Sequence, residues 1–266
     1  MKRTERITGA AAFDAYYREL FGSRWPALKA ALLEKNKPVA FSVNAEKAYY
    51  LDQASIYAAE ALPPIDEGRY LDMCAAPGGK TLVLASRMGQ EVYIQANELS
   101  RSRRLRLFTV LKEHLPAELF KRIEVTGFDA ATLPHLEREC YDRILLDAPC
   151  SSERHVITES KYLAQWTKAR IKILAQRQWA LLSAAFLLLK QGGFVVYATC
   201  ALADAENDGI VQRLLKKYGD AAAVRDADLS KTLSVPYEKT VFGYRFLPDR
   251  CSGAGPLYFS LIEKLY

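Results

Sequence analysis

The fold is decided by the stretch LDMCAAPGGKT at residues 71–81. It follows a short β-rich run, and a helical stretch begins at its end. Small side chains let a backbone approach a ligand closely, and paired glycines permit dihedral angles that other residues resist. The stretch matches neither the phosphate-binding pattern GxxxxGK(S/T) nor the dinucleotide-binding pattern GxGxxG. We interpret it as a tight strand-to-helix turn beside a ligand of another kind.

Around this turn, β-rich runs alternate with helical stretches, which is typical of an α/β sheet flanked by helices. The predicted strands are Arg69–Met73, Glu91–Asn97, Ile123–Gly127, Tyr141–Leu146 and Gly193–Ala198. A late strand at Tyr258–Glu263 is expected at an edge of the sheet. The predicted helices are Lys80–Met88, Ser100–His114, Lys168–Lys190 and Asp204–Lys217. Most of residues 224–248 is predicted to form loops.

The first 60 residues do not follow this alternation. Aromatic and aliphatic side chains recur there at helical spacing, at Phe13, Tyr17, Phe21 and Leu28. A short extended piece follows at Val39–Val43. We therefore predict a small N-terminal appendage at residues 1–60 and a main domain at residues 61–266. The helical spacing favours core packing of the appendage aromatics over stacking against nucleic-acid bases.

Composition narrows the class of protein. The 266 residues include 37 Lys and Arg against 31 Asp and Glu, for a net charge of +6, and this modest excess favours polyanionic partners. The five cysteines are odd in number and lack zinc or redox spacing, so we expect neither a metal site nor a disulfide framework. The longest apolar run, Trp179–Leu189, is shorter than the ~20 residues of a membrane span. We expect a soluble protein of the cytoplasm, with a mitochondrial location as the alternative.

Acidic residues follow four successive predicted strands. They are Asp72, Glu98, Asp129 and Asp147. Ligands of doubly wound sheets bind beyond the carboxyl ends of the strands. A carboxylate after the second strand can accept hydrogen bonds from both hydroxyls of a ribose, and one after the third can accept from an adenine amino group. The pattern predicts a nucleoside-containing ligand.

Two cysteines follow the fourth and fifth predicted strands. Cys150 lies in DAPCSS and Cys200 in YATCAL. A free cysteine is most often a small buried hydrophobe, but two at such positions favour a chemical role. Pyrimidine C5 is a weak nucleophile, and a thiolate that adds to C6 turns the ring into an enamine-like species whose C5 attacks a methyl donor. A thiolate suits this step because it attacks well and also leaves readily.

The strings LDMCAAPGGKT, ANELSRSR, DAPCSS and YATCAL, in this order and spacing, resemble the Nol1/Nop2/Sun family of RNA cytosine-C5 methyltransferases. The resemblance is strong over residues 70–209 and resumes in RFLPDRCSGAGPLYFSLIEK near the C-terminus. It implies an α/β, Rossmann-like, S-adenosylmethionine-dependent methyltransferase sheet. It also implies an RNA substrate, either ribosomal or transfer RNA.

The resemblance assigns roles to residues. Glu98 would hold the ribose, Asp129 would contact the adenine side, and Asp147 would line the methyl-transfer site. Cys200 would be the nucleophile and Cys150 would release the methylated product. The residues implied to cradle S-adenosylmethionine are Cys74, Ala75, Ala76, Pro77, Gly78, Gly79 and Lys80.

The chain departs from the family pattern at three positions. Many members have Asp where this chain has Glu98, and TCS where it has Ala201 after Cys200. Many also have PCSGxG where this chain continues Cys150 with SSERH. No assigned catalytic group is lost, but recognition of the substrate beside Cys150 is put in doubt.

No separate RNA-binding module is recognised, so the appendage or a partner protein would help to bind RNA; the sequence does not define an oligomeric state. Backbone phosphates would be contacted by Lys and Arg. The candidates are Arg101, Arg103, Arg104, Arg106, Lys161, Lys168, Arg170, Lys172 and Arg177. Each run also fits the solvated face of a helix.

Two other functions remain open. A methyltransferase for an exocyclic amine would carry (D/N)PP(Y/F/W) in place of DAPC at residues 147–150, and it would not need Cys200. A catalytically silent RNA-binding or ribosome-assembly factor would keep the fold without the chemistry. Both cysteines and all four acids are intact, which argues against that loss.

Overall fold

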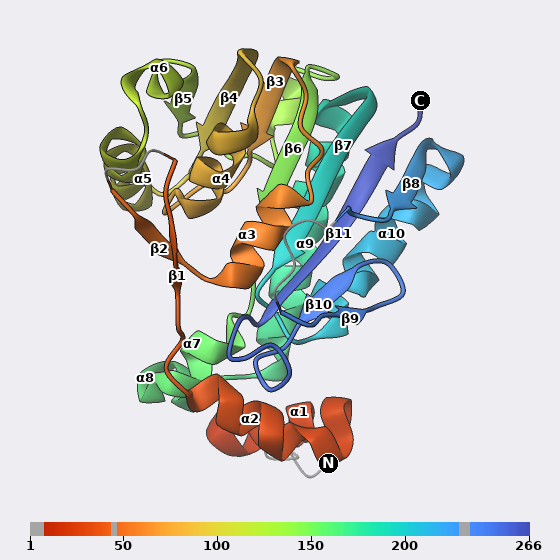
Figure 1. Cartoon of the computed structure of the whole chain (residues 1–266). Helices are drawn as coiled ribbons and strands as arrows, with labels where there is room; N and C mark the ends of the chain where they lie inside the picture. The colour runs from red at the N-terminus through yellow and green to blue at the C-terminus, as the bar shows by residue number, and fades with distance from the viewer. Residues whose placement is uncertain (1–7, 44–46, 229–234) are drawn as a thin grey trace.

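The structure is a computed structural model that describes residues 8–43, 47–228 and 235–266 (Figure 1). Its centre is a mixed sheet that begins with five parallel strands. These are β3 (Glu67–Asp72), β4 (Glu91–Asn97), β5 (Ile123–Thr126), β6 (Tyr141–Asp147) and β7 (Leu189–Thr199). Their spatial order is β5-β4-β3-β6-β7, so the strands that precede the predicted site residues are neighbours.

The other half of the sheet is antiparallel. It consists of β8 (Ala222–Arg225), β9 (Glu238–Lys239), β10 (Tyr244–Phe246) and β11 (Leu257–Lys264). The late strand was wrongly expected at an edge, because β11 lies between β7 and β10 and pairs with β8 as well. Most of its side chains are buried, with Tyr258 in one core cluster and Phe259 in another. The loops expected over residues 224–248 include β9 and β10; residues 229–234 lie outside the described residues.

Helices cover both faces of the sheet. One face packs on α3 (Gln53–Glu60), α4 (Gly79–Arg87) and α5 (Arg101–His114), and the other on α9 (Lys168–Leu188) and α10 (Asp208–Tyr218). Successive residues of β6 alternate between the two cores, as the period of a strand requires. The short α6 (Ala117–Phe120) precedes β5. Helix α9 ends two residues before its predicted end, and β7 begins at once, earlier than predicted.

The N-terminal segment begins below the sheet in Figure 1 and then rises along its left side. It contains α1 (Gly9–Phe21) and α2 (Trp25–Leu33), followed by the paired strands β1 (Val39–Phe41) and β2 (Tyr49–Leu51). Phe13, Tyr17 and Trp25 are buried, as the prediction of core packing required. Their cluster also contains Trp166 and Leu202, which lie beyond Cys150 and Cys200 in the chain. The appendage therefore packs on the segments that follow the two cysteines.

Two further helices separate Cys150 from α9. They are α7 (Glu153–Thr158) and α8 (Ser160–Ala164), and both lie beside the N-terminal helices (Figure 1). At the other end of the appendage, α3 belongs to the core of the main sheet. None of the described helices is both long and apolar enough to cross a membrane.

Candidate active site

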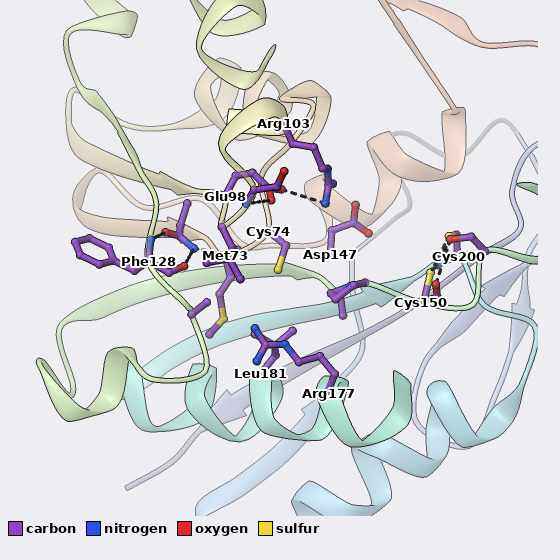
Figure 2. Close-up of a pocket in the computed structure, with 17 residues that line it drawn as sticks. Met73, Cys74, Glu98, Arg103, Phe128, Asp147, Cys150, Arg177, Leu181 and Cys200 are labelled. Carbon is purple, nitrogen blue, oxygen red and sulfur yellow. Dashed lines mark hydrogen bonds and ion pairs between the residues drawn. The ribbon is translucent and has the colours of Figure 1, made fainter. Parts of the chain in front are cut away.

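A cavity of about 570 Å³ lies beyond the carboxyl ends of β3, β4, β6 and β7 (Figure 2). Parallel strands place the residues that follow them at one edge of the sheet, which is where such folds bind ligands. Its walls include five of the predicted site residues, namely Cys74, Glu98, Asp147, Cys150 and Cys200. Figure 2 shows the two thiols at one end of this cavity and Phe128 at the other.

The glycine-rich turn lines this cavity and a smaller one next to it. The smaller hollow, of about 220 Å³, is lined by Cys74, Ala75, Ala76, Pro77, Gly79, Lys80 and Asp147, among others. Gly78 lines neither cavity; it begins α4 with a φ of +118°, which favours glycine. A Cβ on Gly79 would lie 2.8 Å from the ring of Tyr49. The glycines therefore serve the close packing of α4 at least as much as contact with a ligand.

Lys80 and Asp147 form an ion pair beside the cavity. The Lys80 Nζ lies 2.7 Å from Asp147 Oδ2 and 3.2 Å from Ser55 Oγ. Burial lowers the pKa of Lys80, but the neighbouring acidic groups, with Asp147 first among them, together raise that pKa above its usual value. Lys80 is therefore a cation at neutral pH, and it fixes the orientation of the Asp147 carboxylate.

Glu98 presents a buried carboxylate to the cavity. Its Oε1 accepts a hydrogen bond from the Ser100 amide at 2.9 Å, and its Oε2 lies 3.2 Å from Arg103 Nη1. Arg103 also donates to the Ala76 carbonyl at 2.9 Å. The sequence suggested Arg103 only as a contact for RNA phosphates, but its side chain forms part of the cavity wall (Figure 2). Arg103 lies in the first turn of α5 and faces back toward Glu98. This position, shortly after a predicted ligand-binding acid, could have indicated its role from the sequence.

Asp129 is not among the residues that line the cavity, although Phe128 and Ala130 are. Its carboxylate accepts a hydrogen bond from Arg177 Nη2 at 2.6 Å, and this bond lowers the pKa of Asp129. Arg177, on α9, does line the cavity. The buried Asn97 holds this loop in place by accepting from the Phe128 amide at 2.8 Å. At this part of the wall the lining residues are Phe128 and Arg177, and the adenine contact predicted for Asp129 stays a prediction.

The two thiols lie in contact. The sulfur atoms of Cys150 and Cys200 are 2.8 Å apart, and the Cys200 amide donates to Cys150 Sγ at 3.3 Å. The hydroxyl of Ser152 lies 3.3 Å from Cys200 Sγ. The contact with Cys200, together with burial, raises the pKa of Cys150 well above its usual value. Cys150 is therefore a protonated thiol at neutral pH, able to donate toward the sulfur of Cys200.

Asn207 anchors the loop that carries Cys200. Its Oδ1 accepts from Thr199 Oγ1 at 2.6 Å, and its Nδ2 donates to the Ala201 carbonyl at 2.9 Å. These bonds hold the residues on both sides of the cysteine. Asn207 also separates the short turn η3 (Asp204–Glu206) from α10, which the sequence predicted as one helix. Asn207 could not be predicted from helical periodicity, because its partners are set by the conformation of the loop.

A second cavity, of about 650 Å³, meets the first at the thiols. Both cavities are lined by Asp147, Ser152 and Cys200. The second is also walled by residues 33–36, by Arg154 and His155 of α7, and by residues 255–257. Within the described residues, no three His, Cys, Asp or Glu side chains are grouped to hold a metal ion. The arrangement suits a reaction in which two molecules approach one thiol from opposite sides.

The sequence profile of the family described as 16S rRNA methyltransferase RsmB/F matches residues 59–262. The chain belongs to this family. The matched region runs from α3 into β11 and contains every residue that lines the first cavity of this RsmB/F-family protein. This result confirms the predicted relationship to the Nol1/Nop2/Sun methyltransferases.

Individual relatives agree with the RsmB/F assignment. The chain is 33% identical over 229 residues to the 5-cytosine rRNA methyltransferase NSUN4 of Mus musculus, covering 82% of this chain and 60% of that protein. It is 39% identical over 160 residues to the ribosomal RNA small subunit methyltransferase F of Erwinia tasmaniensis, covering 60% of this chain and 33% of that protein. The chain thus spans between one third and three fifths of the length of these two relatives.

Solved structures share the RsmB/F-family fold. A methyltransferase homologue from Pyrococcus horikoshii superposes with a TM-score of 0.72 at 22% identity, covering 95% of this chain and 94% of that one. NSun6 from Pyrococcus horikoshii, solved with SFG, has a TM-score of 0.69 at 27% identity, covering 82% of this chain and 53% of that one. The predicted Rossmann-like methyltransferase fold is confirmed.

Proposed function

We propose that this protein transfers a methyl group from S-adenosylmethionine to C5 of a cytosine in RNA, through a covalent bond between Cys200 and C6 of the base. The observation that carries the proposal is the pair of thiols in contact where two cavities meet. A donor in the first cavity and a base in the second would both reach Cys200. Transfer to an exocyclic amine would leave that thiol without a role.

The residues of the first cavity fit S-adenosylmethionine, which supplies the methyl group as a sulfonium. The Glu98 carboxylate is placed to accept hydrogen bonds from ribose hydroxyls, and Phe128 offers an apolar wall for the adenine. Arg103 and Lys80 are cations near the methionine end of such a ligand. Support also comes from the similar NSun6, which was solved with SFG, an analogue of S-adenosylmethionine.

The chemistry of the base follows from the two thiols. The Cys200 thiolate would add to C6, so a sulfur–carbon bond forms and the electron pair of the C5–C6 double bond becomes available at C5. C5 then takes the methyl group, loses its proton to solvent in the second cavity, and the carbon–sulfur bond breaks as the double bond re-forms. Cys150 is placed to protonate the departing thiolate, because its own thiol stays protonated. Asp147 would accept a hydrogen bond from the amino group of the cytosine and hold the ring beside Cys200.

We propose ribosomal RNA as the substrate, because the relatives in mouse and Erwinia are named for methylation of ribosomal RNA. Of the nine basic candidates, Arg103 and Arg177 are held by ion pairs in the first cavity, and Arg104 donates to the carbonyl groups of Glu98 and Leu99. The exposed residues that remain for phosphate contacts are Arg101, Arg106, Lys161, Lys168, Arg170 and Lys172.

Bisulfite sequencing of total RNA from cells with and without the gene tests the reaction and the substrate together. Loss of protection at one ribosomal cytosine is the expected result, and loss in a transfer RNA would correct the substrate. No change at any cytosine, with the gene expressed, would favour a silent RNA-binding factor instead. Restoring the gene with Cys200→Ala should leave the cytosine unprotected.

A further inference from the structure

A buried carboxylate lies behind the two thiols. Glu153 has no exposed surface, and its Oε1 accepts hydrogen bonds from the hydroxyls of Tyr17 and Ser151. Its Oε2 accepts from the Leu202 amide at 3.1 Å. Ser151 directly follows Cys150, and Leu202 follows Cys200 by two residues. One side chain therefore bonds to the segments that carry both thiols.

A second buried carboxylate holds the same segment from the other side. Glu206 Oε2 accepts from the Ser151 amide at 3.0 Å and from Gln178 Nε2 at 2.8 Å. The same Gln178 nitrogen donates to the Pro149 carbonyl at 3.0 Å. The residues on both sides of Cys150 are thus fixed to α9 and η3, and Glu153 bonds the Ser151 segment to the Cys200 loop as well.

No Lys or Arg of the described ranges forms an ion pair with Glu153 or Glu206. Burial raises the pKa of Glu153, and the hydrogen bonds from Ser151 and Tyr17 oppose that shift. The hydroxyl groups of Ser151 and Tyr17 therefore help to keep Glu153 ionised, so that it can accept hydrogen bonds. A proton on Oε2 of Glu153 would compete with the Leu202 amide for that oxygen, because the amide can only donate.

Tyr17 brings helix α1 into this network. Its ring is fully buried and packs on Trp25 and Trp166, with ring centroids 5.3 and 6.0 Å away. The hydroxyl position is therefore fixed by the docking of the N-terminal helix rather than by the catalytic loops. Displacement of α1 would remove one of the donors to Glu153.

We infer that Glu153 is a positioning residue that sets the separation of Cys150 and Cys200, and that Tyr17 makes this separation depend on the docking of helix α1. The consequence for methyl transfer rests on the proposed function, whereas the separation of the thiols does not. The N-terminal helices would then contribute to catalysis without touching the substrate.

The first test uses phenylarsine oxide, which bridges two close thiols. Tyr17→Phe and Glu153→Gln are compared with wild type, and Tyr16→Phe is the matched control because its ring packs on the same Trp166. Peptide mapping assigns the bridge to Cys150 and Cys200. Wild type and Tyr16→Phe should bind the reagent equally, and the other two variants roughly tenfold more weakly, since small displacements of reacting groups have effects of this order. Equal binding by all four folded proteins would overturn the inference.

Tyr17→Phe keeps the buried ring, so it remains informative even if Glu153→Gln does not fold. Its thermal unfolding midpoint should stay close to that of Tyr16→Phe. In methyl-transfer assays on RNA, with the enzyme concentration corrected to the folded fraction, Tyr17→Phe should lower kcat with the KM for RNA unchanged. The correction is needed because unfolded enzyme would also lower the apparent kcat without changing KM. If Tyr17→Phe and Glu153→Gln bind the arsenical more weakly than wild type but wild type transfers no methyl group to RNA, the proposed function is refuted and the positioning role stands.

Discussion

The sulfur atoms of Cys150 and Cys200 lie 2.8 Å apart, although they belong to loops after two different strands. The two thiols are not equivalent, because Cys150 is buried and its pKa is raised by its neighbour, while Cys200 is partly exposed and lines both cavities. A difference of this kind suits one sulfur that attacks and one that supplies a proton.

Single substitutions should separate the roles of the thiols. Cys200→Ala removes the group that bonds to C6, so methyl transfer to RNA should be abolished. Cys150→Ala removes the proton donor for release, so a covalent RNA–protein adduct should accumulate as a slow band on a denaturing gel. Normal turnover by Cys200→Ala would show that the nucleophile has been misassigned.

Peroxide should join the two thiols in the absence of RNA. A Cys200 thiolate that attacks hydrogen peroxide becomes a sulfenic acid, and the adjacent Cys150 thiol then displaces water to form a disulfide. We expect reversible loss of methyl transfer, regained with dithiothreitol, and a Cys150–Cys200 bridge in peptide mass spectra. Cys140→Ala, with its thiol outside both cavities, is the control and should behave like wild type. A mixed population of other bridges would contradict the expected selectivity.

Glu98→Gln should weaken cofactor binding. The amide accepts only through one oxygen, and hydrogen bonds to a charged group contribute about 1.5–3 kcal/mol, so the dissociation constant for S-adenosylmethionine should rise roughly ten- to hundredfold. Isothermal titration calorimetry measures this directly. Glu91→Gln, at the exposed start of the same strand, should have no effect. If Glu98→Gln binds S-adenosylmethionine as tightly as wild type does, Glu98 does not hold the ribose.

The buried carboxyl of Glu206 should make stability depend on pH. Burial raises its pKa from 4.5 to about 7 in the folded protein. Between these two values the folded state keeps a proton that the unfolded state has lost, so this contribution to the free energy of unfolding is full below the lower value and declines as pH rises toward the upper one. Urea unfolding at about pH 5 and about pH 8 should therefore show a smaller decline for Glu206→Gln than for wild type. Glu159→Gln, at an exposed position, is the control and should decline as wild type does. An equal decline in the free energy of unfolding for wild type, Glu206→Gln and Glu159→Gln would contradict the expectation.

Local pattern was enough to predict five of the residues that line the first cavity. Short segments of sequence are enough to recognise its main parts. These are a turn of small residues after β3, an acid after β4 and a cysteine after each of β6 and β7. The rule that parallel strands end at one edge brings them together without further information. Cys74, Glu98, Asp147, Cys150 and Cys200 do line one cavity.

The remaining features depend on contacts between distant segments. Tyr17 and Glu153 are 136 positions apart, and no periodicity in either segment specifies their hydrogen bond. Asp129 follows its strand as predicted, but it does not line the cavity, and its carboxylate bonds to Arg177 on α9, a partner that no local pattern specifies. The place of β11 was mispredicted for the same reason, since its length and apolar residues indicate a buried strand without naming its neighbours.

The position of β11 has a consequence for the biosynthesis of the protein. Thr199, next to Cys200, pairs with Tyr258 of β11. During synthesis on the ribosome, one edge of β7 therefore has no partner until residues 257–264 have been made. An open strand edge is a site for wrong pairing between chains. The segment that carries Cys200 therefore gains its last backbone partner only when β11 joins the sheet between β7 and β10.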